Sequence, residues 1–120
     1  MISGGNTSIY VSDMDRAVRF YSETLGLRLR SRIGNEWAEI DAGDGMVIGL
    51  HPASPPATVA PGTVGAINVE LKVTGSLDLD VQQLKERGVS FTKPIANYEH
   101  VRIATFTDPD GNVILLAQQI

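Results

Sequence analysis

The sequence predicts an α+β fold in which two βαβββ modules form curved mixed sheets around a cavity, with the helices on the outer face. Two internal repeats indicate this arrangement. The segment 11–27 is matched by the segment 73–89, which begins 62 residues later, and 45–50 is echoed by 111–116 after 66 residues. Self-similarity of this kind indicates a duplicated supersecondary unit. Two similar modules can together build one shared cavity.

The first module opens with a strand followed by a helix. Apolar and polar residues alternate over 6–11, the pattern of a half-buried strand. Ser12 is the predicted N-cap of a helix over 13–25, and Asp15 is its capping-box partner. The apolar stripe of this helix is Met14, Ala17, Val18, Tyr21 and Leu25. Gly26 is expected to end it.

Three strands complete the first module, at 27–33, 36–41 and 46–51. The dipeptide Gly34-Asn35 predicts a two-residue hairpin turn between the first two of them. The glycine-containing segment 42–45 predicts the next turn.

The second module repeats this order. A strand is expected at 67–73, and a helix over 77–87 is capped by Ser76. Strands follow at three places: 89–92, 100–106 and 112–118. The sequence Asp108-Pro109-Asp110-Gly111 resembles a calcium loop only superficially, and turn formation explains it.

We therefore expect one domain over residues 1–120. Module 1 spans about 5–51, and module 2 spans about 64–119. Residues 52–63, rich in Pro, Ala, Ser and Thr, form an irregular linker.

Composition limits the partners and the compartment. The formal net charge is −4 and the chain has no basic run, which argues against nucleic acid and anionic membranes. There is no cysteine, so thiol chemistry is excluded and a cytoplasmic location is the default. The N-terminal residues lack the features of a signal peptide, and the longest apolar run, 113–117, is too short to span a bilayer.

Strand alternation assigns two faces to each sheet. The helix side takes Ile9, Val11, Ile48, Leu50, Val69, Leu71, Ile114 and Leu116. The opposite face takes Asn6, Ser8, Tyr10, Gly49, His51, Asn68, Glu70, Lys72, Leu115 and Ala117. The polar first strands of this second set are equally compatible with a ligand cavity and with a wetted outer face.

Two sets of residues resemble the vicinal oxygen chelate superfamily, which includes glyoxalase I, extradiol dioxygenases, fosfomycin-resistance transferases and bleomycin-type binding proteins. One set is the segment 11–17 with Phe20-Tyr21 and Leu25-Gly26-Leu27, and the other is the segment 106–112. The resemblance covers nearly the whole chain except the linker, and it implies the fold and the cavity.

The resemblance also implies four metal-ligand positions, which here carry Asn6, Gly49, Asn68 and Leu115. Gly49 and Leu115 have no side-chain donor, and two neutral amide oxygens cannot hold a divalent cation against water. We therefore expect no metal and no other cofactor.

Glu70 is the candidate catalytic residue. A carboxylate in mid-strand on the cavity side could serve as a general base or hold a cationic ligand. The alternative is a surface glutamate paired with Lys72 or an arginine. His51 could join Glu70 in a displaced metal site, carry a proton, or simply end its strand before Pro52.

Other residues are candidates for ligand contact. The resemblance implies substrate contacts near Tyr98 and His100, and Arg102 beside them suits a carboxylate or phosphate. Trp37 could stack on a planar ligand or pack in a core or a dimer interface. The ligand-binding set is thus Asn6, Tyr10, Trp37, His51, Asn68, Tyr98, His100 and Arg102. Arg28, Arg30 and Arg32 are predicted to share one strand face and to pair with Glu39 and Asp41.

The function favoured by the resemblance and the altered ligand positions is metal-independent binding of a small organic molecule, as in drug- or metabolite-sequestering proteins of the bleomycin-resistance type. The alternative is an enzyme of the glyoxalase or dioxygenase type that acts on a small metabolite. The resemblance also implies a homodimer, in which a symmetric partner covers edges and apolar faces and completes the cavity.

Overall fold

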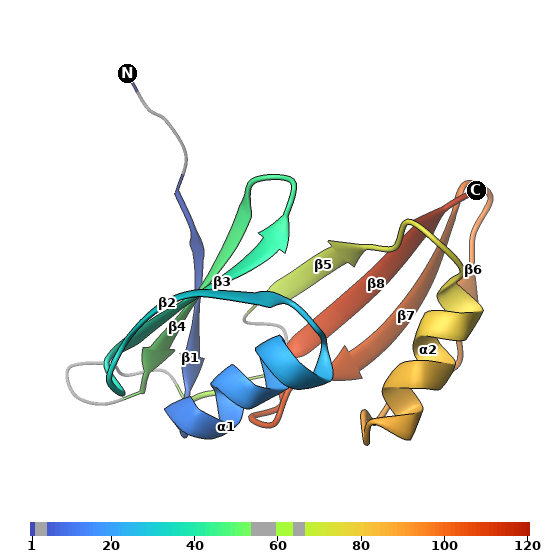
Figure 1. The fold of residues 1–120 in the computed structure, drawn as a ribbon. Coiled ribbons are helices and arrows are strands. Elements are labelled where there is room, and N and C mark those ends of the chain that lie inside the picture. Colours follow the sequence, from blue (N-terminus) through green and yellow to red (C-terminus); the bar gives the residue numbers. More distant parts are fainter. Residues whose placement is uncertain (2–4, 54–59, 64–66) are drawn as a thin grey trace.

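The computed structural model describes residues 1, 5–53, 60–63 and 67–120, which form an α+β fold of two four-stranded mixed sheets (Figure 1). The first sheet has the order β1-β4-β3-β2 and the second the order β5-β8-β7-β6. The strands of the first are β1 (Thr7–Val11), β2 (Arg28–Ile33), β3 (Trp37–Gly43) and β4 (Met46–Pro52). Those of the second are β5 (Asn68–Lys72), β6 (Ala96–Asn97), β7 (Val101–Thr107) and β8 (Val113–Gln119).

The two sheets have the same internal register, as the repeat predicts. β1 runs parallel to β4 with Ser8 opposite Gly49, and β5 runs parallel to β8 with Glu70 opposite Leu115. Asn6 and Asn68 each lie two residues before the first member of these pairs, so they occupy equivalent places in the two modules.

Each module has one helical segment between its first two strands. In module 1, α1 (Met14–Arg19) continues into η1 (Phe20–Thr24), one turn of π-helix. The N-cap of α1 is Asp13, whose carboxylate accepts a hydrogen bond from the amide of Arg16 at 3.0 Å. The prediction of Ser12 as N-cap was wrong because the Ser12 hydroxyl is engaged by Asp110 of the other module.

In module 2, α2 (Leu77–Glu86) begins at the predicted N-cap Ser76, which accepts from the amide of Leu79. The predicted strand at 89–92 is absent apart from one isolated bridge between Phe91 and Phe106. The Val89 amide instead donates to the Leu84 carbonyl at the end of α2. The last carbonyl groups of a helix need donors from outside the helix. Because the Val89 amide serves as one, the chain after α2 does not join the sheet until β6.

β2 departs from the predicted pattern because a bulge lies between Leu29 and Ser31. The extra residue moves Arg32 to the helix side, where it pairs with Asp15. Arg28 stays opposite Asp41, with 3.1 Å between guanidinium and carboxylate. The three arginines therefore do not share one face. The hairpin after β2 is one residue longer than predicted, since Ile33 pairs with Trp37 across residues 34–36.

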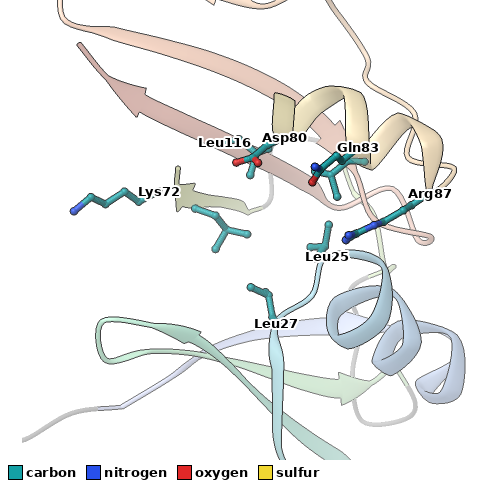
Figure 2. Close-up of a pocket in the computed structure, with 9 residues that line it drawn as sticks. Leu25, Leu27, Lys72, Asp80, Gln83, Arg87 and Leu116 are labelled. Atoms are coloured by element: carbon teal, nitrogen blue, oxygen red, sulfur yellow. The ribbon is translucent and has the colours of Figure 1, made fainter. Parts of the chain in front are cut away.

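The two modules leave a cavity of about 220 Å³ between the end of η1 and α2. Figure 2 shows its lining, which combines residues of both modules: Leu25, Leu27, Leu71, Lys72, Asp80, Gln83, Leu84, Arg87 and Leu116. None of the predicted ligand-binding residues lies in it.

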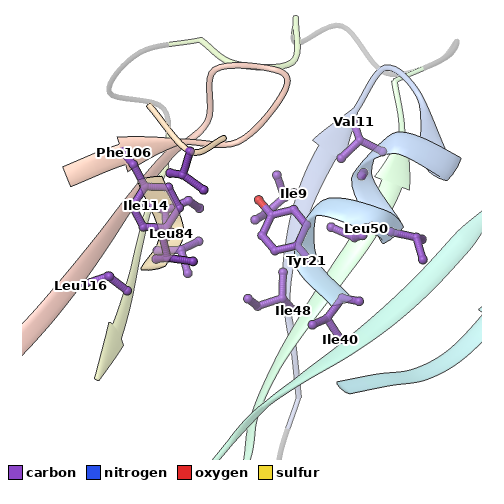
Figure 3. Close-up of a cluster of buried hydrophobic side chains, with 14 of the residues drawn as sticks. Ile9, Val11, Tyr21, Ile40, Ile48, Leu50, Leu84, Phe106, Ile114 and Leu116 are labelled. Atoms are coloured by element: carbon purple, nitrogen blue, oxygen red, sulfur yellow. The ribbon is translucent and has the colours of Figure 1, made fainter. Parts of the chain in front are cut away.

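One hydrophobic core serves both sheets (Figure 3). Ile9, Ile48 and Leu50 of the first sheet face Phe106, Ile114 and Leu116 of the second, with Tyr21 between them. Because both sheets turn their helix sides toward this shared core, their opposite faces point away from each other. We call these the open faces. The open face of module 1 carries Ser8, Tyr10, Trp37, Glu39, Gly49 and His51, and that of module 2 carries Asn68, Glu70, Lys72, Val101, Ile103, Thr105, Leu115 and Ala117.

A buried hydrogen-bond network fixes module 1 on module 2. The Tyr21 hydroxyl donates to Asp108 at 2.8 Å, and Asp108 also accepts from the backbone amide and the side-chain amide of Asn112, each at 2.8 Å. Asn112 accepts in turn from the amide of Gly62. Burial, followed by the neighbouring Asp108 carboxylate, raises the pKa of Tyr21 well above its usual value, so the hydroxyl stays a donor. The 108–111 turn is thus the predicted turn, and its residue Asp108 also makes the buried contact between the two modules.

Candidate functional site

Three of the predicted ligand-binding residues meet on the open face of module 1. Tyr10 and His51 are register partners on β1 and β4, with ring centroids 5.5 Å apart. Trp37 on β3 lies on the other side of His51, with centroids 6.3 Å apart. Both contacts are edge-to-face, at interplanar angles of 83° and 72°. Strand pairing therefore brings together an aromatic row that sequence spacing left on three separate strands.

The indole of Trp37 is held by a charged neighbour. Its Nε1–H donates to Glu39 Oε2 at 3.2 Å, and the Glu39 carboxylate lies 3.7 Å from Arg30 Nε. Sequence reasoning predicted the pairing of Arg30 with Glu39 but missed the link to Trp37. The signal was available, since residues two apart on one strand share a face.

The open face of module 2 is more aliphatic. Glu70 and Lys72 line a hollow of about 230 Å³ together with Val101, Ala117 and Gln119. Glu70 is exposed, and within the described part of the chain no ion pair reaches its carboxylate. It is therefore available to a ligand or to a partner surface.

Asn6 immediately precedes β1 and Asn68 is the first residue of β5, and both are exposed. Asn6 Oδ1 accepts from the Ser8 hydroxyl at 3.1 Å, so part of its hydrogen-bonding capacity is used locally. Each asparagine lies at the end of its open face rather than in the middle.

The donor set does not fit the metal that the fold family implies. Of the four positions, Gly49 and Leu115 carry no donor atom, and Asn6 and Asn68 offer neutral oxygens. Over residues 5–53, 60–63 and 67–120, no three His, Cys, Asp or Glu side chains gather to hold an ion. His51 and Glu70 belong to different sheets whose open faces point apart, so one copy of the chain does not bring them together.

The remaining predicted residues lie in the segment between β6 and β7 or on the helix side of β7. Tyr98 and His100 are exposed between β6 and β7, and His100 lies 3.6 Å from the Glu99 carboxylate. Arg102 is on the helix side of β7, where its two terminal nitrogens donate to Asp78 at 2.9 and 3.0 Å. That bidentate pair anchors the start of α2 to the sheet, which occupies the guanidinium in a structural contact.

The family assignment follows from comparison with known proteins. Residues 5–116 match the model of the Glyoxalase/Bleomycin resistance protein/Dioxygenase superfamily. The chain belongs to this superfamily. It is also similar to the uncharacterized protein YurT of Bacillus subtilis (strain 168), with 31% identity over 94% of this chain and 96% of that protein.

Solved structures of this superfamily have the same fold. TnmS3, an antibiotic binding protein from Streptomyces sp. CB03234, is 32% identical with a TM-score of 0.81, over 100% of this chain and 98% of that one. A superfamily member from Sphaerobacter thermophilus DSM 20745 is 28% identical with a TM-score of 0.79, over 98% of each chain. Among the described residues, no helix has the length and apolar character needed to cross a membrane.

Proposed function

We propose that this protein binds a small organic molecule without a metal, in a cavity formed by the open faces of two copies. The observation that carries this proposal is the orientation of the sheets. The open faces point apart within one chain, and both present apolar side chains to solvent, including Tyr10, Trp37, Ile103 and Leu115. A second copy can place its module 2 open face over the module 1 open face of the first.

The comparisons support the same reading. TnmS3, whose fold covers the whole chain, is an antibiotic binding protein. The four altered ligand positions argue for binding rather than metal-dependent chemistry, because their side chains cannot hold a divalent cation. Drug or metabolite sequestration of the bleomycin-resistance type is therefore the proposed role.

The oligomeric state is the first test. We expect light scattering at micromolar concentration to report twice the chain mass of 12.9 kDa. A mass of one chain would remove the second wall of the proposed cavity. Elemental analysis of the purified protein should also find well under one equivalent of zinc, iron, manganese or nickel per chain.

Subunit mixing tests whether the two walls come from different copies. Trp37→Ala damages one wall and Glu70→Gln the other, so each homodimer has two damaged cavities. In the mixed dimer, one cavity combines an intact Trp37 with an intact Glu70. A 1:1 mixture should regain about a quarter of the wild-type binding capacity, since half the dimers are mixed and one of their two sites is intact.

The control is the double variant Trp37→Ala/Glu70→Gln mixed with wild type. In that mixture, each cavity of the mixed dimer has one damaged wall. Subunit exchange should therefore lower the ligand-binding capacity of the mixture. Failure of the single variants to complement, with dimer exchange verified by mass spectrometry, would place both walls within one copy and refute the proposal.

A further inference from the structure

Gly49 lies in the middle of the first sheet with the indole of Trp37 directly over it. A Cβ atom built on Gly49 would lie 2.3 Å from Trp37 Cη2 and 2.9 Å from Cζ2. Real side chains do not approach so closely, so any larger residue here would displace the ring. The backbone of Gly49 is not in the left-handed region, so its conformation does not require glycine. A glycine inside a strand weakens it, and close approach of another group is the usual reason to find one.

The indole is thus positioned from several directions. Gly49 lies under one side of the ring, the Glu39 carboxylate accepts a hydrogen bond from Nε1, and the His51 ring flanks the indole at a steep interplanar angle. Across the described ranges, no other aromatic ring or cation stacks on the opposite face of the indole. That face is a flat apolar surface on the side where the proposed cavity lies.

The corresponding site in module 2 has neither feature. By register, Leu115 is the counterpart of Gly49, and Ile103 is the counterpart of Trp37. The flat surface is therefore particular to module 1. Brought together by a second copy, the two open faces would present an indole plane on one side and aliphatic side chains on the other.

We propose that Gly49 is a specificity-determining residue: by leaving room for the indole, it makes Trp37 a platform that selects planar aromatic ring systems over non-planar ones of equal size. This inference rests on the proposed function, because it names the ligand class of that site. A flat ring would stack on the indole, and a puckered ring would lose much of that contact.

The chain has a single tryptophan, so one indole N–H resonance reports on this platform. The probes are 2-naphthol and decahydro-2-naphthol, which share a skeleton and a hydroxyl but differ in planarity. We expect 2-naphthol to move the indole resonance upfield in a saturable way by ring-current shielding. Decahydro-2-naphthol should bind at least about tenfold more weakly, a difference of roughly 1.4 kcal/mol.

Gly49→Ala is the decisive variant, and Gly75→Ala is its matched control. A Cβ at Gly75 meets nothing within 4 Å, and its backbone also lies outside the left-handed region. Gly49→Ala should shift the indole resonance of the free protein. It should also lower the affinity for 2-naphthol to about the affinity for decahydro-2-naphthol, so that the preference is lost. Gly75→Ala should leave both unchanged.

The stability of Gly49→Ala separates a positioning role from a structural one. The displaced ring is partly exposed and alanine favours a strand over glycine, so the melting temperature should stay near that of wild type. Equal binding of both probes to wild type, or an unchanged preference for 2-naphthol in Gly49→Ala, would contradict the proposed roles of Gly49 and Trp37. Backbone amide shifts elsewhere on the open faces would in that case still report small-molecule binding, so the proposed function can survive the loss of this inference.

Discussion

The helix sides of the two modules resemble each other, whereas their open faces do not. Three helix-side residues of β3 and β4 have identical counterparts on β7 and β8: Ala38 and Ala104, Ile48 and Ile114, and Leu50 and Leu116. At a fourth position an apolar residue of another shape stands instead, since Ile40 corresponds to Phe106. Six pairs of open-face counterparts differ, whereas Val47 and Val113 at the start of β4 and β8 are the same. The differing pairs are Ser8 and Glu70, Tyr10 and Lys72, Trp37 and Ile103, Glu39 and Thr105, Gly49 and Leu115, His51 and Ala117.

This difference indicates that the two faces of each sheet are under different constraints. The helix sides must fill one shared core at close-packed density, which admits few side-chain shapes. The open faces are free of that demand, so each can present its own chemistry. Module 1 presents aromatic rings and module 2 presents aliphatic side chains beside Glu70 and Lys72. In the proposed cavity between two copies, the two faces would form complementary walls rather than duplicate sites.

The largest effects should come from the helix sides. Ile48 and Ile114 are fully buried counterparts, so Ile48→Ala and Ile114→Ala should each lower the free energy of unfolding by about 2–5 kcal/mol. Leu115→Ala, on the open face next to Ile114, should cost less than about 1 kcal/mol because Leu115 is only partly buried. Urea unfolding of the three variants measures this. Comparable losses for Leu115 and Ile114 would mean that the open face of module 2 is also packed as a core.

Loss of the buried contact between Tyr21 of module 1 and Asp108 of module 2 should have the next largest effect on the free energy of unfolding. Tyr21→Phe removes the buried donor to Asp108, and we expect a loss of about 2 kcal/mol in the free energy of unfolding. Tyr10→Phe is the matched control, because Tyr10 is 39% exposed on the open face. It should leave stability within about 0.5 kcal/mol of wild type. Equal effects of the two substitutions would show that the Tyr21 hydrogen bond does not hold the modules together.

Much of the fold could be predicted from sequence because its signals are local. Alternation located the central strands, helical spacing located both helices, and the repeat related Asn6 to Asn68. The failures at Ser12 and Arg32 arise from features that have no such local signal. Ser12 caps nothing because Asp110 takes its hydroxyl, and Arg32 changes face because of a bulge. Neither the partner nor the bulge has a local signature.

The site could be predicted only in part for the same reason. The sequence placed Tyr10 and His51 on one sheet face and named Trp37 as a candidate without assigning it to that face, so it could not show that the three form one row. Arg102 was a plausible anion ligand by residue type, yet Asp78, which binds it, lies 24 positions away in the sequence. The role of Gly49 depends on which side chain lies above it, and that follows only from the pairing of β3 with β4.

The next prediction concerns the open faces, where substitutions should change binding rather than stability. Glu70→Gln keeps the side-chain shape and removes the charge. We expect affinity for a ligand identified by a thermal-shift screen of aromatic metabolites and antibiotics to fall at least about tenfold, roughly 1.4 kcal/mol. The free energy of unfolding should not change measurably, since Glu70 is exposed and unpaired among the described residues. Full affinity in the variant would make Glu70 a solvated strand residue.

The smallest effect is expected for the surface pair of Asp78 and Arg102 on the helix side of module 2. The hydrogen bond from Arg102 holds the pKa of Asp78 below its ordinary value of 3.8. A carboxyl with a depressed pKa in the folded state stabilises the protein above its unfolded pKa. That stabilisation is lost as the pH falls through the folded pKa. The contribution is therefore fully present at neutral pH and is lost progressively as the pH falls below about 4.

Asp78→Asn should remove this contribution, so its melting temperature should lie slightly below that of wild type at pH 7 and approach it as the pH falls below about 4. Arg102→Gln should give the same convergence, because it removes the other member of the pair. Both variants keep some acid sensitivity, since Arg32 and the Gly43 amide similarly lower the pKa values of Asp15 and Asp41. A gap between wild type and Asp78→Asn that stays constant between pH 7 and acidic pH would show that Asp78 does not act through its charge on Arg102. In that case the anchoring of α2 to β7 would not depend on charge.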